Sequence, residues 1–259
     1  MNEIDQYSGF AKFYDYFLNL NVNYKKYIKL LLQSIQERYP DLKNAVLADI
    51  GGGAGYVTFQ IYNQVKKIIM IEPSEAMLNI AKRKFNSDLH ENIELRRGGF
   101  PACGLEKNSM DIVIAVNDPF QYLLSINEQR LALKDIYQCL KQGGLLFIDN
   151  ANFFSLIRRY RWPKIREFTI GNRKTTWIDQ HDIFPIEELW VHTYNIFVEN
   201  NETGEIKKIV SKHSLKMVSP TEMRLLFEES GFVKVEITAP RLPREREAGL
   251  RMWCFAFKP

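Results

Sequence analysis

A glycine-rich turn near residue 50 is the part of the chain best suited to hold a ligand against its main chain. The apolar residues 45–47 lead to Asp49 and then to Gly51, Gly53 and Gly55, which occupy alternate positions. Glycine accepts positive φ and, lacking a Cβ, lets a ligand approach the backbone closely. A helix predicted directly after the turn would point its free N–H groups at the same ligand. The pattern predicts a strand, a tight turn and a helix around a binding site.

An acidic residue after the second apolar run indicates what kind of ligand this is. Glu72 follows residues 67–71, about twenty residues after the turn. A carboxylate there can accept hydrogen bonds from both hydroxyls of a ribose. The dinucleotide fingerprint G-x-G-x-x-G does not fit, because counting from Gly51 places its third glycine at Tyr56. We therefore expect a nucleoside-shaped ligand other than a dinucleotide.

The position of Asp49 distinguishes between nucleoside cofactors. An acid two residues before the first glycine would repel a pyrophosphate, but it suits a ligand with a cationic amine. S-adenosylmethionine carries such an amine, a sulfonium and a ribose. The acidic-x-Gly-x-Gly-x-Gly turn resembles the first motif of the class I S-adenosylmethionine-dependent methyltransferases.

Three further segments resemble the same family and follow in its order. Residues 71–78 resemble its second motif, residues 109–116 its fourth strand, and residues 140–148 its Leu-Lys-x-Gly-Gly turn into the fifth strand. One position departs from the pattern, because Gly99 and Phe100 stand where the family places Gly-Asp after its third strand. Adenine is then expected to be held by main-chain groups and by packing.

The resemblance implies S-adenosylmethionine as the cofactor and a set of residues around it. The implied contacts are Tyr14, Asp49, Gly51, Gly53, Gly55, Glu72, Pro73, Met77, Gly99, Phe100 and Asn117. Within this set Glu72 would bind the ribose hydroxyls, and Phe100 or Pro73 would pack on adenine. Asp49 would orient the turn or the cofactor amine.

The order of elements predicts an α/β fold with a Rossmann-like, seven-stranded, mostly parallel sheet and helices on both faces. Strands are predicted at 45–50, 67–72, 92–97, 111–116 and 144–149, with two more at 232–238 and 250–257. Helices are predicted at 55–64, 74–85, 127–141 and 219–230. The last strand is expected to run antiparallel to its neighbours, as the resemblance implies.

Two regions outside this core are expected to cover the site. Residues 1–40 have helical apolar spacing and predict an N-terminal helical lid. Residues 152–217 alternate in polarity and predict an antiparallel β insertion after the fifth strand, with a hairpin turn at 200–204, forming an acceptor cap. The cofactor-binding core would comprise 41–151 and 218–259.

The methyl acceptor would lie between these regions. Residues 117–124 resemble the corresponding loop of methyltransferases acting on small-molecule amines, including sugar N-methyltransferases. The predicted acceptor contacts are Tyr7, Asp118, Tyr122, Trp177 and His181. His181 is the candidate general base, with His192 and His213 ranked below it, and no other catalytic residue is assigned. Each also has a structural interpretation, since a strand histidine is often only a packed side chain and Tyr14 could be core.

Composition limits which metals, cellular locations and partners are expected. The chain has 259 residues, a net charge of +4 and three cysteines whose spacing matches no metal site, so no metal is predicted. No apolar run reaches about 18 residues, and no secretory signal is evident, so a cytoplasmic protein without a membrane segment is expected. The basic residues between 158 and 174 would suit a phosphorylated or anionic acceptor, a solvated face or contact with RNA.

The sequence therefore predicts methyl transfer to a nitrogen or oxygen of a small molecule by in-line displacement. Nucleic acid is not the expected partner, and oligomeric state is not predicted. Two alternatives stay open, namely a methyltransferase acting on RNA or protein and a nucleoside-binding protein without catalysis. A nicotinamide oxidoreductase ranks after both.

Overall fold

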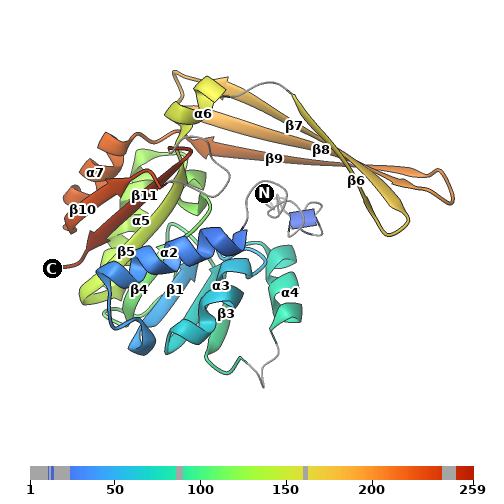
Figure 1. The fold of residues 1–259 in the computed structure, drawn as a ribbon. Helices are drawn as coiled ribbons and strands as arrows, with labels where there is room; N and C mark the ends of the chain where they lie inside the picture. Colours follow the sequence, from blue (N-terminus) through green and yellow to red (C-terminus); the bar gives the residue numbers. More distant parts are fainter. Residues whose placement is uncertain (1–10, 12, 15–23, 86–89, 160–162, 241–248) are drawn as a thin grey trace.

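The computed structural model describes residues 11, 13–14, 24–85, 90–159, 163–240 and 249–259, and these form two β-sheets (Figure 1). The larger sheet has seven strands in the order β10-β11-β5-β4-β1-β2-β3. Strands β1 to β5 pair in parallel, whereas β11 is antiparallel to both β5 and β10. Its strands are β1 (Val46–Ile50), β2 (Lys67–Glu72), β3 (Ile93–Arg97), β4 (Met110–Ala115), β5 (Leu140–Ala151), β10 (Val233–Thr238) and β11 (Arg251–Phe257). The predicted fold class is confirmed, including the antiparallel last strand.

Helices cover both faces of this sheet. The helices are α2 (Tyr24–Arg38), α3 (Tyr56–Ile61), α4 (Glu75–Lys84), α5 (Ile126–Cys139) and α7 (Pro220–Glu229), with short 3₁₀ turns η1 (Leu42–Asn44), η2 (Tyr62–Gln64) and η3 (Pro119–Tyr122). Along β4, Val113 packs into the cluster formed with α5 and α7, whereas Ile112 and Ile114 pack into the cluster formed with α2 and α3. This alternation buries both faces of a central strand and explains its uninterrupted apolar sequence.

Helix starts are specified by local side chains. The Ser74 hydroxyl accepts a hydrogen bond from Met77 N at 3.2 Å and begins α4 directly after the second motif. Capping boxes begin α5 at Ser125 and α7 at Ser219, so the α7 start predicted from the sequence is present. Such caps satisfy backbone N–H groups that have no partner within the helix.

The small sheet is antiparallel and contains β6 to β9. Its strands are β6 (Lys164–Ile170), β7 (Arg173–Phe184), β8 (Leu189–Asn200) and β9 (Ile206–Lys216). The hairpin predicted at 200–204 joins β8 to β9, and Gly204 N donates to Asn200 O at 2.8 Å. Two elements were not predicted, β6 and the short helix α6 (Phe153–Arg159). Their sequences are basic and irregular in polarity, and tertiary contacts, such as the stacking of Phe153 on Trp190 at 5.0 Å, hold this region in place.

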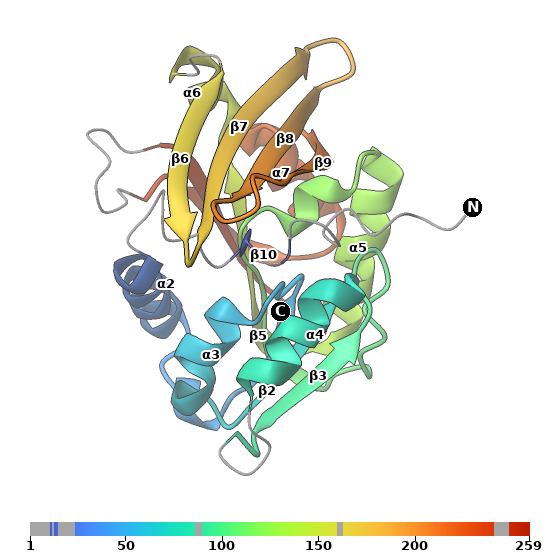
Figure 2. The same cartoon turned by 90° about the vertical axis from the view of Figure 1, so that its right-hand side faces the viewer.

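The small sheet stands over the edge of the large sheet where β4 and β5 end (Figures 1 and 2). A hydrogen bond of 2.9 Å joins Tyr122 of η3 to His213 of β9. Ala11, Phe13 and Tyr14 are helical and are the described residues that precede α2. Tyr7 and half of the predicted lid lie outside the described residues, so the division into lid, core and cap stays a prediction. None of the described helices combines the length and apolar character needed to cross a membrane.

Candidate cofactor and acceptor site

The glycine turn closes the carboxyl end of β1 and is tied to β2 by its main chain. Gly51, Gly53 and Gly55 have φ of 73°, 58° and 77°, which is the left-handed conformation that glycine adopts without strain. Gly51 N donates to Ile71 O at 2.8 Å. A Cβ at Gly51 would lie 2.5 Å from Pro119 Cβ. The turn therefore needs glycine both for its conformation and for the space around it.

Glu72 links this turn to the second motif. Its Oε2 accepts from Gly53 N and its Oε1 accepts from Ser74 N, both at 2.8 Å. The residue is only 4% exposed, so these charge-assisted bonds fix the carboxylate beside the turn. A carboxylate oxygen has two lone pairs and can accept more than one hydrogen bond. Contact between Glu72 and a ribose stays a prediction.

Asp49 lies beneath the turn. It is 1% exposed, and its Oδ2 accepts from the Thr58 hydroxyl at 2.6 Å. Burial raises the pKa of this carboxyl to about 6, against the opposing effect of the Thr58 hydrogen bond. A Cβ at Gly52 would come within 3.2 Å of Asp49 Oδ2. Of the two roles the sequence allowed, orientation of the turn is the one these contacts favour.

Tyr14 links two other predicted site residues, Gly53 and Asn117. Asn117 Nδ2 lies 3.2 Å from the Tyr14 hydroxyl. The Tyr14 ring also covers the turn, because a Cβ at Gly53 would lie 3.6 to 3.9 Å from its atoms. Asn117 has φ of 69° at the end of β4, a left-handed conformation that asparagine tolerates. An N-terminal aromatic residue thus lies over the turn and beside Asn117, two residues after β4.

A buried charge network holds Asn117 from below and was not predicted. Asp149 Oδ2 accepts from Asn117 N at 3.0 Å and from the Tyr27 hydroxyl at 2.5 Å. Arg251 Nε contacts Asp149 Oδ1 at 2.8 Å, and Arg251 Nη2 contacts Asp118 Oδ1 at 2.7 Å. Burial raises the pKa of Asp118, and the adjacent Arg251 opposes the rise. Asp118 thus belongs to this network, and its predicted contact with the acceptor has no support in these bonds.

The predicted adenine side is lined by apolar groups. A Cβ at Gly99 would lie 3.3 Å from Pro73 Cδ, so the two predicted residues are adjacent. Phe100 packs edge-on against Phe120 at 5.8 Å between ring centroids. Met77 is 1% exposed and packs with Ala11 and Ala54. These positions stay predicted contacts.

The small sheet turns a polar and aromatic face toward this region. Trp177 is fully buried and packs with Tyr194 and with the partly buried Tyr14. Tyr122 reaches the same face through its bond to His213. The small sheet therefore contacts the residue that also covers the glycine turn.

His181 does not offer a free lone pair for catalysis. The Trp190 indole N–H donates to His181 Nδ1, and an indole can only donate. Nδ1 is therefore unprotonated in the neutral ring, which places the proton on Nε2, 2.7 Å from Asp179 Oδ1. Because both ring nitrogens are engaged, this geometry argues against His181 as the general base.

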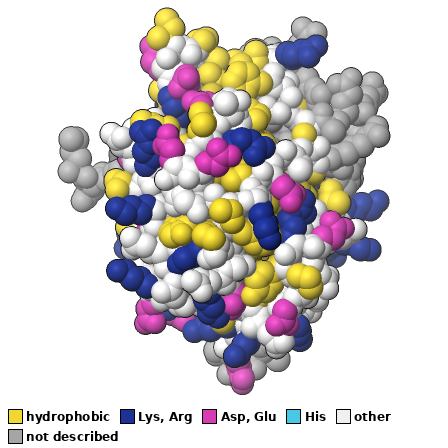
Figure 3. Space-filling model, turned by 90° about the vertical axis from the view of Figure 1, so that its left-hand side faces the viewer, with side chains coloured by type: hydrophobic (Ala, Val, Ile, Leu, Met, Phe, Trp, Pro, Cys, Tyr) yellow, Lys and Arg dark blue, Asp and Glu magenta, His cyan; other side chains and the backbone are white. Residues whose placement is uncertain are grey.

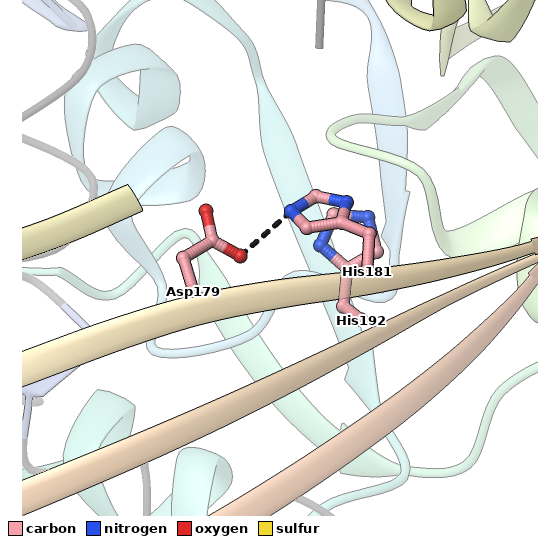
Figure 4. Close-up of side chains that lie close together, drawn as sticks. All are labelled: Asp179, His181 and His192. Carbon is pink, nitrogen blue, oxygen red and sulfur yellow. Dashed lines mark ion pairs between the residues drawn. The ribbon is translucent and has the colours of Figure 1, made fainter. Parts of the chain in front are cut away.

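One group of side chains on the neighbouring strands β7 and β8 resembles a metal site (Figure 4). A carboxylate oxygen of Asp179 and one ring nitrogen each of His181 and His192 lie within 4.8 Å of one another. Such a His₂–carboxylate group could suit a transition metal. A metal at His181 Nε2 would displace the ring proton, which Nδ1 cannot take while it accepts from Trp190. The Trp190 contact therefore disfavours metal ligation.

Sequence comparison identifies the core. Residues 47–144 match the family described as "Methyltransferase domain". The demethylmenaquinone methyltransferase of Lactococcus lactis is 31% identical over 130 residues, covering 49% of this chain and 50% of that protein. The chain spans about half the length of this relative and of the malonyl-[acyl-carrier protein] O-methyltransferase of Bacillus cereus, which is 29% identical over 146 residues.

Similar solved structures extend over nearly the whole chain. DesVI of Streptomyces venezuelae has a TM-score of 0.79 at 16% identity and covers 96% of this chain and 98% of its own. CalS10, an amino pentose methyltransferase of Micromonospora echinaspora solved with bound S-adenosylmethionine, has a TM-score of 0.75 at 16% identity, with 95% and 96% covered. At this identity the likeness shows the fold.

The residues of this region fit S-adenosylmethionine. The glycine turn leaves its main chain accessible, the buried Glu72 carboxylate lies beside it, and the Tyr14 ring lies over Gly53. The predicted resemblance is confirmed. Residues 47–144 match a methyltransferase domain, and the chain shares its fold with solved S-adenosylmethionine-dependent methyltransferases.

Proposed function

We propose that this chain transfers a methyl group from S-adenosylmethionine to a nitrogen or oxygen of a small molecule held between the large sheet and the small sheet. The observation that carries the proposal is the position of Tyr14. It lies over Gly53, contacts Asn117 and packs with Trp177 of the small sheet. One side chain thus joins the predicted cofactor site to the predicted acceptor side.

The bound cofactor supplies a methyl group on a sulfonium whose leaving group is a neutral thioether. The protein then has to position the acceptor in line and exclude water. Gly51, Gly53 and Glu72 would hold the amino-acid and ribose parts, and Asn117 would lie under the methionine part. Tyr14 would cover the turn and separate the cofactor from solvent.

Amines are the first acceptor class to test. DesVI and the amino pentose methyltransferase CalS10 share the fold over at least 95% of this chain, which supports amino sugars as acceptors without identifying one. An anionic group on the acceptor is a further possibility to test, although Arg166 lies 3.9 Å from Asp179 and Lys174 lies 3.3 Å from Glu167. These cations already have acidic neighbours.

An RNA acceptor is the second candidate. On the face in Figure 3, Lys and Arg side chains are interspersed with Asp and Glu, and the residues coloured there form no continuous basic surface. Proteins that follow a nucleic-acid backbone need such a surface. This face therefore offers no track for a nucleic-acid backbone.

The test combines cofactor binding with turnover. Calorimetry should detect binding of S-adenosylmethionine and S-adenosylhomocysteine, and labelled cofactor should transfer methyl to members of a panel of amines, phenols and nucleotide sugars. Gly53→Val should abolish cofactor binding, because a branched side chain at φ of 58° is strained and would fill the space under Tyr14.

Gly204→Val is the matched control. Gly204 has φ of 70° in the β8–β9 turn with nothing within 4 Å of an added Cβ, so this variant carries similar backbone strain without blocking the site. Retained cofactor binding in Gly53→Val would contradict the placement of the site. Binding of a dinucleotide in place of the adenosyl compounds would contradict the proposed function itself.

A further inference from the structure

Three histidines form a row across the small sheet. The pairing registers place His181 of β7 opposite His192 of β8, and His192 opposite His213 of β9. Residues directly opposite in an antiparallel sheet project from the same face. His213 bonds to Tyr122, so this is the face turned toward the end of β4. The row is an arrangement that no local sequence motif indicates.

The two outer histidines have both ring nitrogens engaged. His181 contacts Trp190 and Asp179, as described above. His213 Nδ1 lies 2.9 Å from the Tyr122 hydroxyl, and its Nε2 lies 2.8 Å from the Ser211 hydroxyl. Both residues are buried, at 7% and 3% exposed. They are held in place rather than presented to a ligand.

His192 differs from its neighbours in burial and bonding. Its Nδ1 lies 3.3 Å from the Tyr194 hydroxyl, and no hydrogen bond to its Nε2 is found among the described residues. His192 is also only partly buried, although it stands on the face turned toward the core. His192 is therefore the most exposed of the three histidines. The Tyr194 ring beside it packs in the cluster that includes Tyr14.

We propose that His192 contacts the methyl acceptor and that its Nε2 takes the proton that the acceptor nitrogen or oxygen loses on methylation. This inference rests on the proposed function. The proposal requires the tautomer in which Nδ1–H donates to the Tyr194 oxygen, which leaves the lone pair on Nε2. On transfer the acceptor gains a carbon bond and loses one proton, which forms the new Nε2–H bond. The resulting imidazolium releases the proton to solvent.

The surroundings of His192 suit this role. Burial, then the nearby His181 and His213, and then Lys164 lower the pKa of His192 well below its ordinary value. The ring therefore stays neutral near pH 7 and keeps a lone pair. Asp179 lies close enough to its ring to stabilise the transient positive charge, because the ligand atoms of Asp179, His181 and His192 all lie within 4.8 Å.

Chemical modification tests this geometry without an acceptor. Diethyl pyrocarbonate acylates an unprotonated imidazole nitrogen that it can reach, and the chain has four histidines. Peptide mass spectrometry at pH 7 should show His192 modified before His181 and His213. Modification of His181 before His192 would overturn the inference, because it would mean that the Trp190 and Asp179 contacts do not hold that ring.

Kinetics test the proton transfer. His192→Gln keeps a hydrogen-bonding group near the Nε2 position but cannot take a proton at neutral pH. With an amine from the panel as acceptor, kcat should fall by roughly 100-fold or more, whereas KM for the acceptor should change little. Lys212→Gln, an exposed substitution on the neighbouring strand β9, should leave kcat unchanged. Unchanged kcat in His192→Gln would overturn the inference.

The pH profile supplies a readout that a structural role would not affect. The wild-type kcat/KM, calculated on the concentration of unprotonated amine, should stay level as the pH falls past the ordinary histidine pKa of about 6.5, and then drop as His192 is protonated. His192→Gln should lose that drop. The two proposals also fail differently, because turnover that survives in His192→Gln removes only this one. Absence of turnover with every panel acceptor removes both.

Discussion

Arg251 lies 2.8 Å from Asp149 through its Nε and Oδ1 atoms, and this buried pair joins the final strand to β5 directly below Asn117. Asp149 also accepts the backbone N–H of Asn117 and the hydroxyl of Tyr27. One carboxylate therefore connects the helix α2, the end of β4 and two strands of the sheet. Such a network is costly to break, since removing one charge leaves the others buried without compensation.

Arg251→Met should destabilise the fold by about 3–5 kcal/mol, because it leaves the buried Asp149 and the partly buried Asp118 without their cation. Urea unfolding measures the loss. Arg130→Met is the control, since Arg130 and Glu229 form an exposed pair with side chains 49% and 50% exposed, and it should cost at most about 1 kcal/mol. Equal effects of the two substitutions would contradict the assigned role of the network.

Asp49→Asn should change how stability depends on pH. Burial raises the pKa of Asp49 to about 6, above the unfolded value of about 3.9. The folded protein therefore binds this proton more tightly than the unfolded chain does. The resulting contribution to the free energy of unfolding is fully present below about pH 4 and is lost as the pH rises through about 6. The stability of Asp49→Asn relative to wild type should be higher at pH 7.5 than at pH 4 by about 2–3 kcal/mol. Urea unfolding at both pH values checks this, and a pH-independent difference would contradict it.

Tyr14→Phe should weaken cofactor binding without removing it. The substitution deletes the hydroxyl that lies 3.2 Å from Asn117 Nδ2 but keeps the ring over Gly53. Loss of a neutral hydrogen bond of about 0.5–1.5 kcal/mol predicts a 2- to 12-fold rise in Kd. Tyr39→Phe is the matched control, because the Tyr39 hydroxyl contacts Asp111 beside the start of β4. Calorimetry with S-adenosylhomocysteine should show affinity unchanged in the control.

Trp190→Phe should create a metal site that the wild type disfavours. The substitution keeps an aromatic ring against Phe153 but removes the N–H that fixes the proton of His181 on Nε2. His181 Nε2 then becomes available to join Asp179 and His192 as a ligand. Zn²⁺ titration should show a Kd at least about 10-fold lower than that of wild type, a gain of about 1.4 kcal/mol. Asp179→Asn in the Trp190→Phe background should remove the gain, and tight Zn²⁺ binding by wild type would contradict the tautomer.

The core elements were predictable because their signals are local. The apolar run at β1, the glycines after it and the Ser74 cap of α4 lie next to the residues they act on. The capping box at Ser219 likewise specifies the start of α7 from four consecutive residues. Periodicity and caps of this kind are visible without knowing what packs against them.

Other features could not be predicted because they depend on distant residues. β6 became a strand by pairing with β7, although its own sequence is mixed in polarity. Asp118 was expected to face the acceptor, but Arg251 contacts it from the last strand of the large sheet. His181 was the candidate base, but the Trp190 indole N–H donates to its Nδ1 lone pair. The hairpin register, which places Trp190 opposite Ile183, brings these two side chains together.

The sequence alone determined the α/β fold and the strand–turn–helix of the predicted cofactor site. Glycines at alternate positions permit the left-handed backbone of the turn, and the acid after the next strand bonds to it over a short range. Only the tertiary structure decided which side chains complete the site. The histidine row exists because β7, β8 and β9 pair in one register, and a slip of one residue would turn a strand's histidine to the opposite face. Strand register results from packing over the whole small sheet, which no short segment encodes.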